Sequence, residues 1–530
     1  MSGLFRVWGR YITEDYATHP IRGGVAMVIM KFGGTSVENA TAIQRVAEIV
    51  RSRRDQGPVV VVSAMAKVTD QLVLMGQEAA AGNVDTCLAL LNSLRQRHLE
   101  AAGQLVSARS LKKLTAALEN TFRELETFIR GVAAVHELSP RSSDYLNAFG
   151  ELLSSQIVAA AFPERELDAV WVDSRQCVVT DATHTHAHPL MDETRERAHA
   201  KIAPIVAKHK IPVMGGFIAA TREGVTTTLG RGGSDYSAAI VGAALDADSI
   251  EIWTDVEGMM TTDPRLCPDA RTIRRISFNE AAELAYFGAK VLHPATLLPA
   301  IEKNIPVYVL NSRNLSSKGT RITARAPRGL YTFRAITAKT GVTLVNVVAS
   351  RGLVVHDFLR SVFEALDTYG ASVDLVAISE VSLSFTMETK RLPKALLDDL
   401  EKIADVTSEP QQAIICLVGE DIHGKPGIAA SVFNTVAEAC VNVRMISQGA
   451  SEINISFVVQ ESDVPRAVRH LHAHFFSSLA AEAEEAKLGA GNRRAKNKGN
   501  GSGRLNNGKA PGLAARGNAK SRRARSASPV

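Results

Sequence analysis

The sequence has few cysteines and no long apolar run. Its five cysteines are widely spaced and form no Cys-x-x-Cys motif, which argues against a disulfide framework or a structural zinc site and favours a reducing compartment. No run approaches the roughly 18 apolar residues of a transmembrane helix. Residues 1–26 lack the apolar core of a secretory signal. We therefore expect a cytoplasmic protein with no membrane partner and a disordered extension at 1–26.

Acidic residues are missing from the C-terminal end. Residues 487–530 contain twelve Lys or Arg and no Asp or Glu, so the formal net charge of +6 divides into +12 there and −6 over residues 1–486. Such a segment cannot bury enough apolar area to offset its chain entropy, which predicts a disordered basic tail at 482–530. A nucleic-acid partner is therefore expected only if the tail binds one.

What the chain does have is apolar material for several cores. Its 530 residues are 45% apolar and 22% charged, and roughly 150 residues per domain gives three or four domains. Short β-type runs alternate with helical stretches up to about residue 318, which predicts an α/β domain with a mainly parallel sheet over 27–318. The expected strands are Val28–Met30, Val59–Val62, Ala169–Val172, Pro212–Met214, Ile250–Trp253 and Val307–Leu310.

An internal repeat follows this domain. Ser-Val-Phe occurs at 361 and again at 431, and Ser-Glu occurs at 379 and again at 451, so the two pairs recur at nearly the same spacing. Each copy combines a helical stretch with an alternating strand. The repeat therefore predicts two small α/β modules, over 330–400 and 410–480.

Two glycine-rich motifs stand between a strand and a helix. Lys31-Phe-Gly-Gly-Thr-Ser-Val lets backbone N–H groups approach a phosphate closely, with Lys31 as a nearby charge. Leu229-Gly-Arg-Gly-Gly-Ser-Asp adds Arg231, whose guanidinium suits a carboxylate or phosphate. A tight turn remains an alternative for the first motif. Helix capping by Ser234 or Asp235 remains one for the second.

Three further segments carry polar residues of interest. Trp253–Arg265 follows a strand, where ligands bind in open α/β sheets, and Phe287-Gly-Ala-Lys places Lys290 near a glycine. His184, His186 and His188 alternate and would share one face of a strand, which could hold a metal ion. The surrounding Thr and Ala favour a loop instead, so we predict no metal site.

These motifs, with Gly150-Glu-Leu-Leu-Ser and Val62-Ser-Ala-Met-Ala-Lys-Val-Thr69, resemble the aspartate kinase family of the amino acid kinase superfamily. The resemblance covers about residues 27–475 and follows the family's order. It implies a three-layer amino acid kinase-like domain followed by two ACT modules of ferredoxin-like βαββαβ form. It also implies the monofunctional type, without a dehydrogenase domain.

The resemblance implies transfer of the γ-phosphoryl group of ATP, with Mg²⁺, to the β-carboxylate of L-aspartate, the first step toward lysine, threonine and methionine. Because a carboxylate with a pKa of about 3.9 is already ionised at pH 7, the reaction needs cations and positioned amides more than a base.

Met260 stands where the family often has Tyr, so it is assigned no contact. Asp235 is expected to orient Lys31 or the ligands of Mg²⁺. The implied catalytic residues are Lys31, Asp235 and Lys290; those around aspartate are Ser63, Thr69, Glu151, Arg231 and Ser234; those around ATP are Lys31, Phe32, Gly33, Gly34, Thr254, Asp255, Arg265, Lys290 and Val291.

The ACT resemblance implies feedback control by an amino acid, lysine or threonine, and a homodimer or homotetramer joined through these modules. Lysine is our hypothesis. A glutamate or acetylglutamate kinase, or a non-catalytic amino-acid sensor, are the alternatives. The implied effector contacts are Phe358, Leu359, Ser372, Val373, Asp374, Ser379 and Glu380.

Overall fold

The computed structural model describes residues 26–288, 294–326, 333–349, 355–420, 422, 426–449 and 453–476. The predicted tail lies outside these ranges, as do Lys290, Val291 and the predicted extension apart from Ala26. Within them, no helix is long and apolar enough to cross a membrane.

An eight-stranded sheet organises the chain as far as β10. Its strand order is β3-β4-β2-β1-β7-β9-β10-β8, and the first six of these strands are parallel. All six strands expected from the apolar runs are present. The sheet strands are β1 (Val28–Phe32), β2 (Pro58–Val62), β3 (Ala169–Val172), β4 (Ile211–Gly215), β7 (Ser249–Thr254), β8 (Arg275–Ser277), β9 (Val307–Asn311) and β10 (Thr320–Thr323), beside a hairpin of β5 (Ile218–Ala220) and β6 (Thr226–Thr228).

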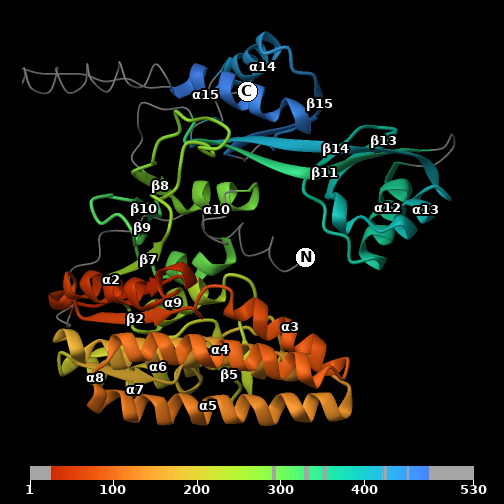
Figure 1. Ribbon diagram of the computed structural model, residues 1–530. Coiled ribbons are helices and arrows are strands. Elements are labelled where there is room, and N and C mark those ends of the chain that lie inside the picture. Colours follow the sequence, from red (N-terminus) through yellow and green to blue (C-terminus); the bar gives the residue numbers. More distant parts are fainter. Residues whose placement is uncertain are drawn as a thin grey trace, which may run out of the picture. The chain divides into compact units, whose positions relative to one another are not determined.

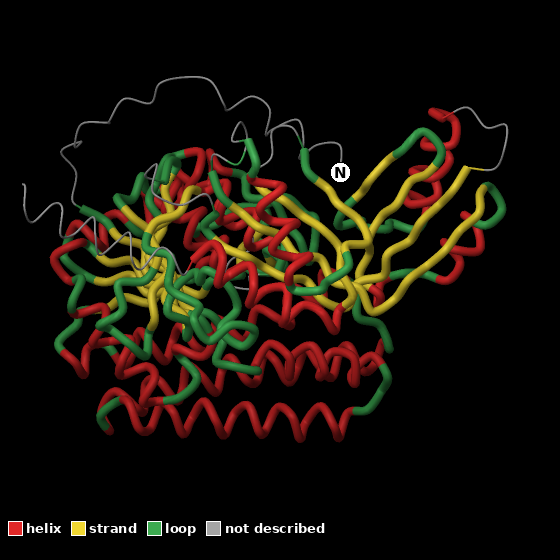
Figure 2. The backbone as a smooth tube through the Cα atoms, turned by 90° about the horizontal axis from the view of Figure 1, so that it is seen from above, coloured by secondary structure: helices red, strands yellow, loops and turns green. Residues whose placement is uncertain are grey.

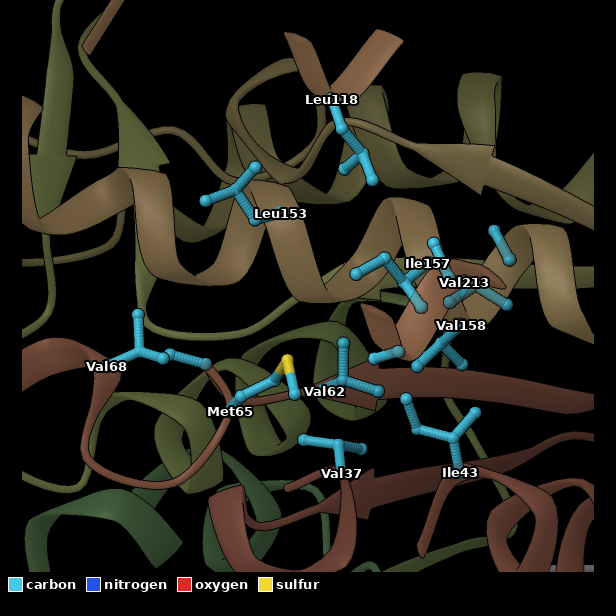
Figure 3. Packing of buried hydrophobic residues seen from close by; sticks show 14 of the residues in the cluster. Val37, Ile43, Val62, Met65, Val68, Leu118, Leu153, Ile157, Val158 and Val213 are labelled. Atoms are coloured by element: carbon cyan, nitrogen blue, oxygen red, sulfur yellow. The ribbon is translucent and has the colours of Figure 1, made fainter. Parts of the chain in front are cut away.

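Helices cover both faces of this sheet because its central strands are apolar on both sides. In β1, Met30 and Phe32 pack into one core, and Ile29 packs into the other. Figure 1 shows the long helices α4, α5 and α6 lying side by side, and Figure 3 shows α6 packed on the strands through Leu153 and Ile157. This is the predicted three-layer arrangement. The helices are α2 (Ala40–Arg51), α3 (Val68–Ala80), α4 (Val84–Leu105), α5 (Ala108–Val135), α6 (Pro140–Ala161), α7 (Met191–Lys201), α8 (Ala203–Ala207), α9 (Gly233–Ala244), α10 (Phe278–Tyr286) and α11 (Leu298–Glu302).

Local signals in the sequence set several of these helix starts. The Asn39 side chain accepts the Ala42 N–H at the start of α2, and Ser139 with Pro140 begins α6. Ser277 and Glu280 form a capping box at α10. These caps fix where each helix meets the sheet.

The repeat region forms one six-stranded antiparallel sheet, with the order β12-β13-β11-β14-β16-β15. Figure 2 shows its long strands running side by side. The matched Ser-Val-Phe motifs lie in α12 and α14, and β13 and β16 are the corresponding strands of the two copies. The elements are β11 (Ala335–Ala349), α12 (Val355–Thr368), β12 (Val376–Ile378), β13 (Ser382–Glu388), α13 (Lys394–Leu400), β14 (Ala404–Val418), α14 (Ile428–Glu438), β15 (Val443–Ser447), β16 (Asn454–Gln460) and α15 (Val464–Phe476).

The pairing of β11 divides the two modules differently from the predicted boundaries at 330–400 and 410–480. Residues 342–348 pair with β13 and residues 342–349 pair with residues 404–412, whereas residues 335–339 pair only with residues 414–418. The first module is therefore 342–411, with strand order β12-β13-β11-β14. The second is 335–339 together with 412–476, so the first module is inserted into the second. Repeat spacing alone gives a period and does not reveal which strands pair.

Candidate functional site

The carboxyl ends of β1, β2, β4 and β7 meet at one edge of the large sheet, where the glycine-rich segments lie. Backbone hydrogen bonds continue past the strands: Gly33 N–H donates to Trp253 O at 3.1 Å, and Gly216 N–H donates to Val62 O at 2.8 Å. Ser63 N–H donates to Phe32 O at 3.0 Å. Parallel sheets of this kind bind ligands outside these strand ends.

Lys31 and Asp235 form the charged centre of this edge. Lys31 lies in β1 on the face toward α9, and Asp235 lies in the first turn of α9. Lys31 Nζ is 2.6 Å from Asp235 Oδ1, with side chains only 10% and 15% exposed. This pair holds the ammonium in a fixed place beside the glycine loop.

The Gly33-Gly34 loop is tightly packed at Gly34 and in ordinary contact at Gly33. A Cβ on Gly34 would lie 3.0 Å from Ala64 O, and one on Gly33 would lie 3.7 Å from Lys31 Nζ. Phe32 is fully buried, so only its backbone is available here. The loop therefore places a tight glycine backbone beside a cation, which fits a phosphate, with the Gly33 N–H itself bonded to Trp253 O.

Glu151 lies beneath the same loop, in the middle of α6. It is 3% exposed, and its Oε1 accepts the Ala64 N–H at 3.0 Å. Among the described residues, its Oε2 has no hydrogen-bond partner. Burial raises the pKa of Glu151 to about 8, although the Ala64 N–H and the Lys31 charge favour its ionised form. A buried carboxylate with a free oxygen is ready to receive a cationic group.

Arg231 lies in the Leu229–Asp235 segment, four residues before Asp235. Gly230 and Gly232 both adopt left-handed backbone, with φ of 74° and 71°, and Arg231 between them is exposed. Ser234 packs so closely on Gly216 that a Cβ there would lie 2.8 Å from it. Ser63 and Thr69 are half-buried, at the end of β2 and in the first turn of α3.

The predicted nucleotide-side residues are only partly assembled. Thr254 ends β7 and Asp255 follows it, at the same edge as Gly33. Arg265, in contrast, is engaged by Asp263, with Nη2 2.6 Å from the carboxylate and an 87% exposed side chain. The structure does not bring Arg265 to the glycine loop.

Sequence reasoning missed the turn after β4. Phe217 has φ of 64°, which is rare for a residue with a side chain, and its N–H donates to Ser237 Oγ at 2.8 Å. Its ring lies against Gly233, where a Cβ would be 2.6 Å away. The Gly215-Gly216 pair directly after an apolar strand was the available signal, since it repeats the pattern at Gly33-Gly34.

The three alternating histidines lie in a loop. His184 Nδ1 lies 2.6 Å from Asp144, His186 Nδ1 lies 3.0 Å from Thr185 Oγ1, and His188 Nδ1 lies 3.0 Å from Asp181. No group of three His, Cys, Asp or Glu residues able to hold a metal ion occurs in the described part of the chain. The rings serve separate hydrogen bonds.

The predicted effector residues surround the start of β12. Asp374 is paired with Lys339 of the second module at 2.7 Å, and its side chain is 8% exposed. Ser379 and Glu380 are exposed, as is Ser372. Phe358 is instead a core residue, 2% exposed, while Leu359 and Val373 pack on that core while partly exposed.

The second module also contacts the polar segment after β7. Thr261 Oγ1 is 3.0 Å from His472 Nε2 in α15, and Ile336 N–H donates to Thr261 O at 2.8 Å. On α10, Glu280 accepts the Glu420 N–H at 2.9 Å. These bonds connect the second module with the segment after β7 and with α10.

Comparison with known proteins is consistent with this geometry. A model of the amino acid kinase family matches residues 26–311, and an ACT domain model matches residues 415–475. Aspartokinase 3, chloroplastic, from Arabidopsis thaliana is 36% identical over 86% of this chain and 82% of its own length. This chain belongs to the aspartokinase family.

Two solved structures are similar over nearly their whole length. The E. coli aspartokinase III complex with aspartate and ADP, called the R-state, is 34% identical with a TM-score of 0.73, covering 85% of this chain and all of that one. The complex of the same enzyme with lysine and aspartate, called the T-state, is 35% identical with a TM-score of 0.73, covering 85% and 99%. Both confirm the predicted fold class.

Proposed function

We propose that this chain is an aspartate kinase, transferring the γ-phosphoryl group of ATP to the β-carboxylate of L-aspartate to give 4-phospho-L-aspartate under feedback control. The observation that carries the proposal is the Lys31–Asp235 pair beside the Gly33-Gly34 loop. The proposal is supported by a cation that lies near both the glycine loop and the Glu151 carboxylate, because two anions must approach each other in this reaction.

Each substrate group has a chemical counterpart among these residues. Glu151 receives the aspartate ammonium on its free oxygen, and Arg231 receives the α-carboxylate. Ser63, Thr69 and Ser234 line the remaining wall. The β-carboxylate then faces Lys31 without needing a base, because it is already ionised.

The phosphates of the nucleotide lie on Gly33 and Gly34. The rest of the nucleotide lies toward Thr254 and Asp255. Arg265, Lys290 and Val291 are assigned to the nucleotide by the family resemblance alone, since Arg265 is paired with Asp263 and the other two lie outside the described residues. Mg²⁺ fits as an ion carried by the phosphates, since it keeps few protein ligands in such sites. It neutralises phosphate charge there, and Asp235 positions Lys31.

Control by lysine through the first module is part of the proposal. Asp374 has the charge and burial that suit an effector ammonium. The exposed Ile378 and Val381 at the edge of the sheet support pairing with a second copy, giving a homodimer or homotetramer. The five free cysteines, four of them buried, support a reducing cytoplasm.

Trapping the product tests the proposal. With ATP, Mg²⁺ and hydroxylamine, we expect aspartate to give a hydroxamate, and glutamate or acetylglutamate to give none. Millimolar lysine is expected to suppress the signal. Aspartate-independent ATP turnover, or preference for glutamate, would contradict the proposed substrate.

A further inference from the structure

A buried carboxylate outside the proposed catalytic set lies next to the Arg231 segment. Asp144 is in α6, two helical turns before Glu151, and is fully buried. It accepts hydrogen bonds from the Thr185 N–H at 3.0 Å and from the Thr228 hydroxyl, and its Oδ2 is 2.6 Å from His184 Nδ1. Because an ionised carboxylate can only accept, the His184 nitrogen is the donor.

These bonds hold the 184–187 loop in an unusual conformation. Thr185 has φ of 71°, which is rare for a β-branched residue, and its N–H points to both oxygens of Asp144. Ala187 N–H donates to Thr228 O at 3.0 Å. The loop is thus tied to Asp144 and β6 together.

The loop in turn limits where the Arg231 segment can lie. A Cβ on Gly230 would lie 3.0 Å from Thr185 O and 2.9 Å from His186. Gly230 and Gly232 flank Arg231 with left-handed backbone, so the segment has little stiffness of its own. Its position depends on the anchored residues before it.

We propose that Asp144, His184 and Thr228 form a positioning site that fixes the Arg231 loop and so sets the affinity for the α-carboxylate of the amino-acid substrate. The proposal rests on the proposed function, because Arg231 is assigned there to the substrate. None of the three residues touches the reacting atoms, so they act through Arg231.

A matched control lies on either side of the 184–187 loop. His188 and Asp181 form a second His–Asp pair at 3.0 Å, but their side chains are 73% and 37% exposed. The bonds of Asp181 go to Thr183 and His188 within the loop. This pair therefore has the same chemistry without the connection to α6 or β6.

The experiment compares Thr228→Val with Thr228→Ser, and His184→Leu with His184→Asn, in the full chain. Losing a hydrogen bond to a charged group is expected to raise the aspartate KM and the calorimetric aspartate Kd about tenfold in the Val and Leu variants. The Ser and Asn variants retain a donor and should stay within about twofold of the wild type. The ATP KM should stay within about twofold in all four, as should every constant of the control His188→Leu.

Two results would overturn the proposal. One is an aspartate Kd that does not change in Thr228→Val and His184→Leu, or an equal rise in the ATP KM. The other is loss of folding in both of these variants, which would assign the network to stability alone. Calorimetry measures the aspartate Kd without turnover. If the wild type forms no hydroxamate, the proposed function is contradicted, but the effect of the variants on the aspartate Kd can still be measured.

Discussion

Two lysine–aspartate pairs lie in the two halves of this molecule, and their lysines stand in different strand settings. Lys31 and Asp235 are 2.6 Å apart in the kinase domain, and Lys339 and Asp374 are 2.7 Å apart between the two regulatory modules. Lys31 belongs to a central strand paired on both sides. Lys339 is the last residue before a register shift in β11.

The difference indicates two uses of one interaction. A lysine fixed by a central strand can present its charge to an incoming phosphate without moving. A lysine at an irregularity of a strand can leave its carboxylate when another ammonium arrives. Asp374 Oδ2 has no hydrogen-bond partner in the described part of the structure, and Asp235 Oδ1 has only its ion pair with Lys31, so the strand setting of each lysine is what distinguishes the two pairs. We therefore regard the first pair as permanent and the second as exchangeable.

The largest expected effect comes from breaking the permanent pair. Lys31→Met should lower kcat/KM at least about 1,000-fold, because the charge between two anions is lost. Lys303→Met is the control, since Lys303 forms an exposed pair with Asp246 at 3.2 Å. The hydroxamate assay measures both, and a fall of less than tenfold in Lys31→Met would remove Lys31 from the centre of the reaction.

Glu151 is the carboxylate in this region without its own lysine, and its effect should depend on pH. Its pKa of about 8 in the folded chain means that the free enzyme must release a proton to bind the substrate ammonium. We expect kcat/KM for aspartate to fall about tenfold per pH unit below pH 8, reaching about 100-fold at pH 6. Glu151→Gln should have low activity with no such slope, and a wild-type profile that is flat from pH 6 to 9 would contradict the assignment.

The same group predicts how stability changes with pH. Between the ordinary value of 4.5 and about 8, the unfolded chain has released a proton that the folded chain retains. The contribution of Glu151 to the free energy of unfolding therefore decreases as pH rises through this window. In thermal melts, Glu151→Gln should show a smaller loss of Tm between pH 5 and 8 than the wild type. Glu100 is exposed, so Glu100→Gln should lose as much Tm as the wild type.

The smallest expected effect comes from the exchangeable pair. Lys339→Met should free Asp374 for the effector and lower the half-inhibitory lysine concentration about tenfold, with basal activity unchanged. Asp374→Asn should abolish inhibition. Lys402→Met, which breaks an exposed pair with Asp399, should alter neither value. Unchanged lysine inhibition in both Lys339→Met and Asp374→Asn would contradict an effector site at this pair.

Sequence reasoning was accurate where chemistry and position along the chain coincide. The strands around Lys31 were predictable because parallel strands buried on both faces form continuous apolar runs. The pairing of Lys31 with Asp235 was expected only from the resemblance to the family, because neither glycine motif specifies its partner. The apolar runs are local, so the sequence contains them directly.

The missed features depend on contacts between distant segments. Asp144 looks like an ordinary polar residue of a helix until the 184–187 loop is placed on it. Phe358 lies in the core of the first module, 2% exposed, and its place at an effector site stays a prediction. Strand 335–339 joins the second module because its pairing partners are at 414–418, and the period of the repeat cannot specify such a distant partner.

That strand exchange has a consequence for how the chain can be edited. The first module leaves and rejoins the second at neighbouring points, because Lys339 pairs with Ile414 and Val342 pairs with Gln412. A short turn could join these two strands as an ordinary hairpin. The segment 342–411 is therefore an insertion between two neighbouring positions of the second module. It can be removed or exchanged for another ligand-binding unit without breaking the chain within the kinase domain or the remaining strands. A truncation from the C-terminus has no such option, since it would leave strand 335–339 without its partner.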